Sequence, residues 1–218
     1  DANTTVSITG GGATTNATAV AVVNTNQIVD VATFSGRVWV AQGRTVTYSA
    51  ALDELQKDLY LNGEAIITSY QPAAHSDGDS IVFFRRSDVL VTGEVFDMTR
   101  FPVIDLAKGG SIQGVIDSLN RIIAITVPPV PLIWQDGGTV VVPAHGELAH
   151  EADVVDYRDM VTIIRDRVKD MIGKGLTLAQ VQQADPAKGY RRRYGTDSGP
   201  WTTTQFIEAV YKSLSEAK

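Results

Sequence analysis

Residues 80–92 read SIVFFRRSDVLVT, which is two apolar runs joined by a polar turn. The runs are Ser80–Phe84 and Asp88–Thr92, and neither alternates strictly between apolar and polar residues. A strand that is apolar along most of its length is typical of a sheet covered on both faces, as in α/β proteins. Gly93 and Glu94 follow the second run, so a carboxylate is expected just beyond the end of a buried strand.

The sequence before these strands is also β-rich. Asn62-Gly63 is a strong two-residue turn signal and predicts a hairpin over residues 58–71. Residues 1–50 carry few charges and are rich in Thr, Ala, Val, Gly and Asn. Short strands are expected within them at residues 20–23, 28–31 and 37–40.

The sequence after these strands is mostly helical. Apolar residues at helical spacing follow Ser111, a good N-cap, and predict a helix over residues 112–123. Residues 139–142 predict one more buried strand, which Pro143 ends. The remaining expectations are a long helix from Asp153 to Gly173, a short one over 178–184, and a last helix whose capping box is Thr202 with Gln205.

Composition excludes several classes of function. The chain has 218 residues and a net charge of −6, which argues against a nucleic-acid-binding surface. It has no cysteine, hence no disulfide, no thiolate nucleophile and no cysteine metal ligand. No apolar run reaches the roughly 18 residues of a membrane span. The first residue is Asp1, so processing of the N-terminus or a missing upstream segment is expected, and the compartment, cytoplasmic or exported, stays open.

Three polar residues occupy similar places relative to the expected strands. His75 precedes Ser80–Phe84 by a turn, Glu94 follows Asp88–Thr92, and His145 follows the strand at 139–142. Ligands and catalytic groups in α/β proteins favour the carboxyl ends of strands. Two imidazoles and a carboxylate are adequate ligands for zinc or iron.

Simpler interpretations of the same residues remain open. His75 could cap the turn that contains Asp77 and Asp79, and those two carboxylates could be acid–base groups or plain turn residues. Glu94 could be a solvated loop carboxylate. His150 is expected to be exposed and without a role.

Several short motifs resemble the metallo-β-lactamase superfamily in order and spacing. Residues 74–80 resemble its third metal-ligand motif, Thr92–Phe96 its fourth and Pro143–Gly146 its fifth. Residues 101–112, 157–161 and 201–203 are similar to a branch of these hydrolases, so the resemblance covers roughly residues 55–218. It implies that His75 binds a first metal, that His145 binds a second and that Glu94, where Asp is commoner, bridges them.

The chain departs from the family at its main metal motif. The family has a His-x-His-x-Asp-His motif upstream, whereas the histidines of this chain are His75, His145 and His150. Each of two zinc ions would retain one histidine and a share of Glu94, and a catalytic zinc usually has three protein ligands. Bound zinc is therefore expected to be reduced or absent, although the family holds up to two ions.

The sequence thus predicts an α/β fold, an αββα sandwich that is incomplete or atypical in its N-terminal part. It is expected to form a single domain over residues 1–218, with a divergent β-leaning segment at 1–50 and the family-like half at 55–218. The expected function is a metal-dependent hydrolase of a small molecule, or a truncated form that is weak or inactive alone. The alternative is a non-catalytic binding or structural module. A half-sandwich would expose an apolar sheet face, which predicts a homodimer or a missing N-terminal fragment as partner.

Overall fold

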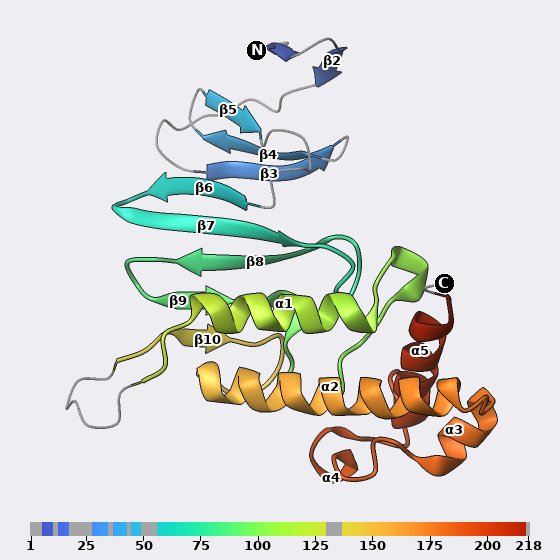
Figure 1. Ribbon diagram of the computed structural model, residues 1–218. Helices are drawn as coiled ribbons and strands as arrows, with labels where there is room; N and C mark the ends of the chain where they lie inside the picture. The colour runs from blue at the N-terminus through green and yellow to red at the C-terminus, as the bar shows by residue number, and fades with distance from the viewer. Residues whose placement is uncertain are drawn as a thin grey trace. The chain divides into compact units, whose positions relative to one another are not determined.

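The computed structural model describes residues 6–10, 13–17, 28–34, 37–42, 45–48, 56–129 and 137–216 (Figure 1). Contacts between residues divide the chain into two compact units, Asp1–Leu55 and Gln56–Lys218. The boundary falls close to the change in composition near residue 50. The expectation of a single domain over the whole chain stays a prediction.

The first unit is built from antiparallel strands. A hairpin is formed by β1 (Val6–Gly10) and β2 (Ala13–Ala17), and a separate sheet has the order β3 (Ile28–Phe34), β4 (Arg37–Gln42), β5 (Thr45–Tyr48). The strands expected at 28–31 and 37–40 are therefore confirmed, and each is longer than expected. The strand expected at 20–23 lies outside the described residues.

The second unit contains a five-stranded mixed sheet of order β10-β9-β8-β7-β6. Four of its strands form an antiparallel meander: β6 (Gln56–Leu61), β7 (Glu64–Gln71), β8 (Asp79–Phe84) and β9 (Val89–Val91). The hairpin expected at 58–71 is confirmed, because Asn62 and Gly63 both have positive φ (52° and 78°) between β6 and β7. Such a pair of positive φ angles is what a type I′ turn requires.

The fifth strand, β10 (Val140–Val142), pairs in parallel with β9, and Val142 lies opposite Val91. A parallel pair needs a crossover, which here contains α1 (Ile112–Ile125) and the short 3₁₀ helices η1 (Gly93–Val95) and η2 (Leu106–Lys108). The carboxyl ends of β9 and β10 therefore meet at one edge of the sheet. Because β8 is antiparallel to β9, its first residue, Asp79, lies at that same edge.

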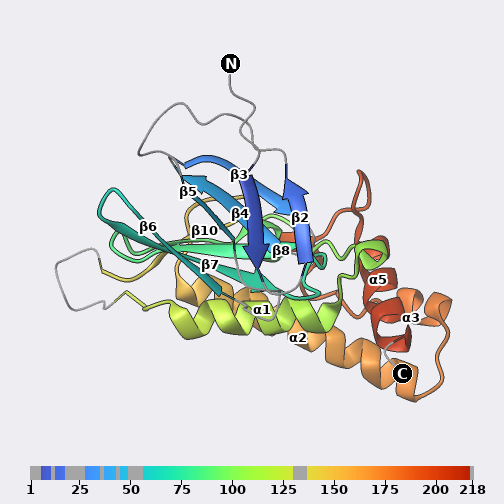
Figure 2. The same ribbon diagram turned by 90° about the horizontal axis from the view of Figure 1, so that it is seen from above.

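Two helices, α1 and α2 (Glu151–Gly173), lie side by side along one face of this sheet (Figures 1 and 2). Ile81 and Leu90 are completely buried, whereas Val82, Phe83 and Phe84 are half-buried. The coverage of both faces that the apolar runs predict is therefore only partial along β8. The class predicted from the sequence, mixed α/β, is confirmed.

The long helix begins earlier than the sequence predicts. It starts at Glu151 rather than Asp153, because Asp153 acts as the third helical residue and its carboxylate accepts a hydrogen bond from the His150 N–H at 3.0 Å. His150 is therefore the N-cap residue of α2 and is half-buried. The expectation that His150 is exposed was therefore wrong, whereas the expectation that it has no functional role stays a prediction.

The remaining helices close the second unit. α3 (Leu178–Ala184) and α5 (Thr203–Glu216) occupy the predicted positions, and Thr202 and Gln205 form the predicted capping contacts. The one-turn helix α4 (Arg191–Tyr194) was not predicted. Helix α5 packs against α1, α2 and α3. Among the described helices, none combines the length and the apolar composition needed to cross a bilayer.

A cluster of buried aromatic rings joins the segment after β9 to the helices. The Phe101 ring stacks on Phe206 of α5 with centroids 4.7 Å apart, and Tyr157 of α2 meets Phe96 edge-on at 5.2 Å. Tyr194 contacts both Phe101 and Tyr157. Aromatic pairs in these geometries add stability beyond the area they bury. The segment from Phe96 to Phe101 is therefore held firmly against the core.

The loop between β7 and β8 lies directly on the first turn of α1. A side chain at Gly114 would place its Cβ 1.9 Å from the Ala73 carbonyl oxygen, and one at Gly110 would lie 2.1 Å from the His75 carbonyl oxygen. The Ser111 N–H donates to the Ala73 carbonyl at 2.8 Å, and the Asp105 N–H donates to that of His75. Only glycine allows this approach, so these contacts fix the backbone of His75.

Replacing glycine by alanine within a helix usually stabilises a protein, but Gly114→Ala should destabilise this one. Its methyl group would overlap the Ala73 carbonyl, and we expect a loss of about 1–3 kcal/mol in the free energy of unfolding. Gly173→Ala is the control, because no atom lies within 4 Å of the added Cβ at this last position of α2. The control should be neutral or stabilising by up to about 1 kcal/mol. Urea unfolding measures both, and equal effects would contradict the close contact.

Candidate functional site

The three residues singled out from the sequence lie at one edge of the five-stranded sheet. His75 lies in the loop before β8, Glu94 in η1 directly after β9, and His145 three residues beyond β10. Buried Thr92 links the ends of the two parallel strands, because its N–H and its hydroxyl both donate to the Val142 carbonyl at 3.1 Å. As the sequence predicts, Glu94 and His145 follow the ends of strands, and His75 precedes β8 by a turn.

Glu94 and His145 form a direct pair. The His145 Nε2 lies 3.9 Å from the Glu94 Oε1, and the two side chains are 51% and 43% exposed. Two backbone hydrogen bonds connect their loops: the Met98 N–H donates to the His145 carbonyl at 3.1 Å, and the Ala144 N–H donates to Phe96. The ends of β9 and β10 thus hold an imidazole and a carboxylate next to each other and open to solvent.

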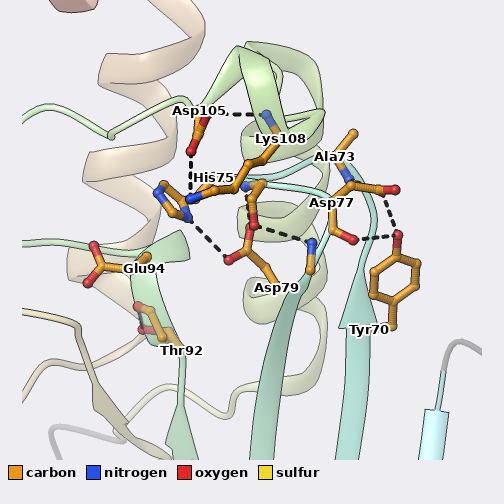
Figure 3. Close-up of polar contacts among 12 residues, drawn as sticks. Tyr70, Ala73, His75, Asp77, Asp79, Thr92, Glu94, Asp105 and Lys108 are labelled. Carbon is orange, nitrogen blue, oxygen red and sulfur yellow. Dashed lines mark hydrogen bonds and ion pairs between the residues drawn. The ribbon is translucent and has the colours of Figure 1, made fainter. Parts of the chain in front are cut away.

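His75 has a different partner. Its Nδ1 lies 3.4 Å from the Asp79 Oδ1, and the other oxygen of Asp79 accepts a hydrogen bond from the Ser76 N–H at 2.6 Å (Figure 3). A carboxylate beside Nδ1 orients the imidazole, and Nε2 lies on the side of the ring away from Asp79. Glu94 lies nearby in the same view, on the neighbouring η1, without a direct polar contact to His75.

Asp77 lies in the turn before β8 and Asp79 is the first residue of that strand, and both make local contacts. Asp77 accepts hydrogen bonds from the Tyr70 hydroxyl at 2.5 Å and from the Ala73 N–H at 3.3 Å (Figure 3). Burial, followed by this hydrogen bond to Asp77, raises the pKa of Tyr70 to about 12. Of the two interpretations left open by the sequence, the local structural one describes the contacts of both aspartates, and Asp79 also positions His75.

Arg100 is the residue that sequence reasoning missed. Its Nε donates to the Asp97 Oδ2 at 2.7 Å, and its Nη2 lies 3.3 Å from the Glu94 Oε2. Asp97 is only 3% exposed, and its other oxygen accepts from both the N–H and the hydroxyl of Thr99. The guanidinium is thus held by a buried carboxylate and faces Glu94.

The backbone of Arg100 is fixed as well. The Tyr157 hydroxyl donates to the Arg100 carbonyl at 3.0 Å from the buried face of α2. Complete burial raises the pKa of Tyr157 well above its usual value, and the charge of Asp97 adds to this shift. The phenol therefore stays protonated and remains a donor. No sequence motif signals Arg100; the only hint is its spacing of three residues from Asp97.

The donors at this edge do not fit a catalytic zinc ion. Among residues 56–129 and 137–216, no group of three His, Asp or Glu side chains is close enough to share one metal ion. His75 is turned toward Asp79, and the Glu94 carboxylate is shared between His145 and a guanidinium. A catalytic zinc usually needs three protein ligands. The assignment of His75, Glu94 and His145 as metal ligands stays a prediction.

Comparison with solved structures shows which fold this is. A stereoselective inverting sec-alkylsulfatase from Pseudomonas sp. superimposes with a TM-score of 0.53 at 14% identity, over 75% of this chain and 26% of its own. A metallo-β-lactamase family protein from Thermus thermophilus also matches, with a TM-score of 0.45 at 17% identity, over 73% of this chain and 47% of its own. The chain has a metallo-β-lactamase-type fold.

This likeness concerns the fold alone. The chain spans about a quarter of the length of the sulfatase it matches. No protein-family model matches the sequence, and no curated protein sequence matches it. The fold predicted from the short motifs is thus confirmed by three-dimensional similarity rather than by sequence similarity.

Tyr70→Phe should change how stability depends on pH. The raised pKa means that the folded state favours the protonated phenol, so the stabilisation is present below pH 10 and is lost as the pH rises from 10 to about 12. The free energy of unfolding of the wild type should therefore fall more steeply over this range than that of Tyr70→Phe. Urea titrations of both proteins at several pH values measure the difference. Parallel curves would contradict the raised pKa of Tyr70.

Arg100→Gln should strengthen the binding of zinc at this edge. Removing the guanidinium frees the Glu94 carboxylate and removes a repelling charge, so we expect affinity to rise by about two- to tenfold, since the pair is partly exposed. Arg158→Gln is the matched control, because Arg158 is about as exposed as Arg100 but contacts Asp159 and Asn120 instead of Glu94. Competition with a zinc-sensitive dye gives the dissociation constants. Equal values for the wild type and Arg100→Gln would show that Arg100 does not control Glu94.

Proposed function

We propose that this chain is a metallo-β-lactamase-type hydrolase whose site needs metal ligands beyond His75, Glu94 and His145 to be fully active. The observation that supports it most directly is the pairing of Glu94 and His145 at the ends of two adjacent parallel strands. In an open α/β sheet this is where catalytic groups gather. The three side chains remain partly exposed at one edge, where a small substrate has access.

The substrate class follows only in outline from the matched proteins. The sulfatase is named for sec-alkyl sulfates and the lactamase-family protein for lactams. A sec-alkyl sulfate is an ester of sulfuric acid, and a lactam is a cyclic amide. We therefore propose a small molecule with an ester-type or amide-type bond as the substrate of this chain.

A non-catalytic module is the second candidate, and one contact favours it. The charge of Glu94 is balanced by Arg100, which is itself held by buried Asp97. A carboxylate balanced in this way is stable without a metal ion. In this alternative the fold persists as a binding or structural scaffold.

Metal analysis and hydrolysis assays separate the two candidates. The purified protein should retain well below one equivalent of zinc after dialysis, because three protein ligands for a single ion are not assembled among the described residues. In excess zinc it should hydrolyse one of three test substrates, 4-nitrophenyl acetate, 4-nitrophenyl sulfate or a chromogenic cephalosporin, faster than buffer with zinc alone.

His145→Ala and His75→Ala should each reduce that rate to background, and His150→Ala is the control. His150 lies at the N-cap of α2, and its imidazole belongs to no pair at the sheet edge. Unchanged hydrolysis in His145→Ala would refute the assignment of the site. An absence of hydrolysis by the wild type at every zinc concentration would favour the scaffold. Retention of two equivalents of zinc would contradict the need for further ligands.

A further inference from the structure

The face of the five-stranded sheet that points away from α1 and α2 is strongly apolar. Successive side chains of a strand point to opposite faces of a sheet. Ile81, Leu90 and Val141 belong to the buried core under the two helices (Figure 1). The residues next to them in sequence therefore point to the opposite face, which we call the outer face. A sheet face that meets water usually carries polar side chains, so an apolar outer face needs an explanation.

Strand pairing aligns the outer-face side chains in two rows that cross all five strands. The first row is Leu59, Ile66, Phe84, Val89 and Val140, and the second is Lys57, Thr68, Val82, Val91 and Val142. All of them are half-buried, and the apolar ones are neither members of the core cluster nor packed against it. The two rows are thus apolar without being part of the core.

Polar side chains surround the two rows. Tyr70 and Ser80 lie opposite each other beyond the second row, and Glu64 lies beyond the first. The charged member of the rows is Lys57, which lies on the edge strand β6, where its long stem allows the ammonium group to reach water. An apolar centre with a polar rim is the usual composition of a protein–protein interface.

The outer face is large enough for such an interface. Five strands at the usual spacing span about 24 Å, and the six residues of β8 extend over about 20 Å. Two faces of this size would bury on the order of 1,000 Å² in total, which reaches the lower limit for specific interfaces. An interface at this limit is expected to be weak, so association should be measurable at micromolar concentrations.

A second copy of the chain matches the outer face in charge and in size. A two-fold axis brings the residues near it onto their own copies, and the centre of the two rows carries no charge that would repel itself. The face of a second copy also has the same width of about 24 Å, whereas a sheet of three strands, such as β3 to β5, is only about 14 Å wide.

We propose that the outer faces of two copies pack against each other and form a homodimer, with the two sheets inside and the helices outside. The apolar rows of each copy cover those of the other, at the separation of about 10 Å that packed sheets adopt. This association does not depend on the proposed hydrolysis, because it needs neither a metal ion nor the Glu94–His145 pair. Failure of one proposal therefore leaves the other standing.

Sedimentation equilibrium of the full chain, with a chelator present, measures the association. The weight-average mass should rise from the 23.5 kDa of the monomer toward twice that value as the concentration increases. The useful range runs from about 1 to about 200 µM, because an interface of this size is expected to dissociate in the micromolar range.

Two variants and a matched control locate the interface. Ile66→Lys places a charge in the first row and should raise the dimer dissociation constant by about tenfold or more, because the ammonium group would be buried without a partner. Ile163→Lys makes the same replacement on α2, where Ile163 is 38% exposed, and should leave the constant unchanged. Val82→Thr keeps the shape of the side chain and should weaken the dimer by about two- to tenfold. This variant tests the proposal even where Ile66→Lys does not fold.

Three results would overturn the proposal. One is a monomer at every concentration, which would assign the outer face to another segment or partner. Another is a dimer whose dissociation constant is the same in the wild type, Ile66→Lys and Val82→Thr, which would place the interface elsewhere. The third is an equal loss of association in Ile163→Lys, which would mean that the outer face has no special part in it.

Discussion

The loop that carries His75 lies against the first turn of α1 with no space for a side chain between them. Gly110 and Gly114 are the positions that permit this contact, and Ser111 adds donors from both its N–H and its hydroxyl to the Ala73 carbonyl. The same serine hydroxyl caps α1 by accepting from the Gly114 N–H. One short segment therefore begins the helix, donates hydrogen bonds to the loop carbonyl groups and fixes the backbone of a candidate site residue.

The charged side chains at the sheet edge are paired in a different way from the ligands of a metal centre. In a metal site several ligands bind one cation, whereas here each candidate ligand lies next to another side chain. His75 lies next to Asp79, and Glu94 lies next to His145 and Arg100. The arginine is the most constrained of these groups, because Asp97 is buried and the aromatic cluster lies beneath the same segment. Among the described residues, the charge of Glu94 is thus balanced by a guanidinium rather than by a metal ion.

Local patterns in the sequence predicted most of the second unit. Asn62-Gly63 predicted the hairpin of β6 and β7, and Ser111 and Thr202 predicted the starts of two helices. Glu94 and His145 were correctly placed after strands, and they lie at one edge because β9 and β10 both end there. The contacts of those side chains were not predictable. Arg100 reaches Glu94 only because the chain folds back after η1, and spacing in the sequence carries no signal of that turn.

The order of the strands has a consequence for folding. Strands β6 to β9 pair with their neighbours in sequence, so each pairing closes only a short loop. Strand β10 is instead separated from β9 by about fifty residues, which include α1, and pairs with it in parallel. Long-range pairings of this kind form slowly, because the chain loses the entropy of loop closure before the contact contributes any stability. The meander is thus expected to assemble first. The neighbourhood of Glu94 and His145 would then be among the last parts of the molecule to take shape, and during synthesis or refolding the two residues would meet only after the sheet that supports them is in place.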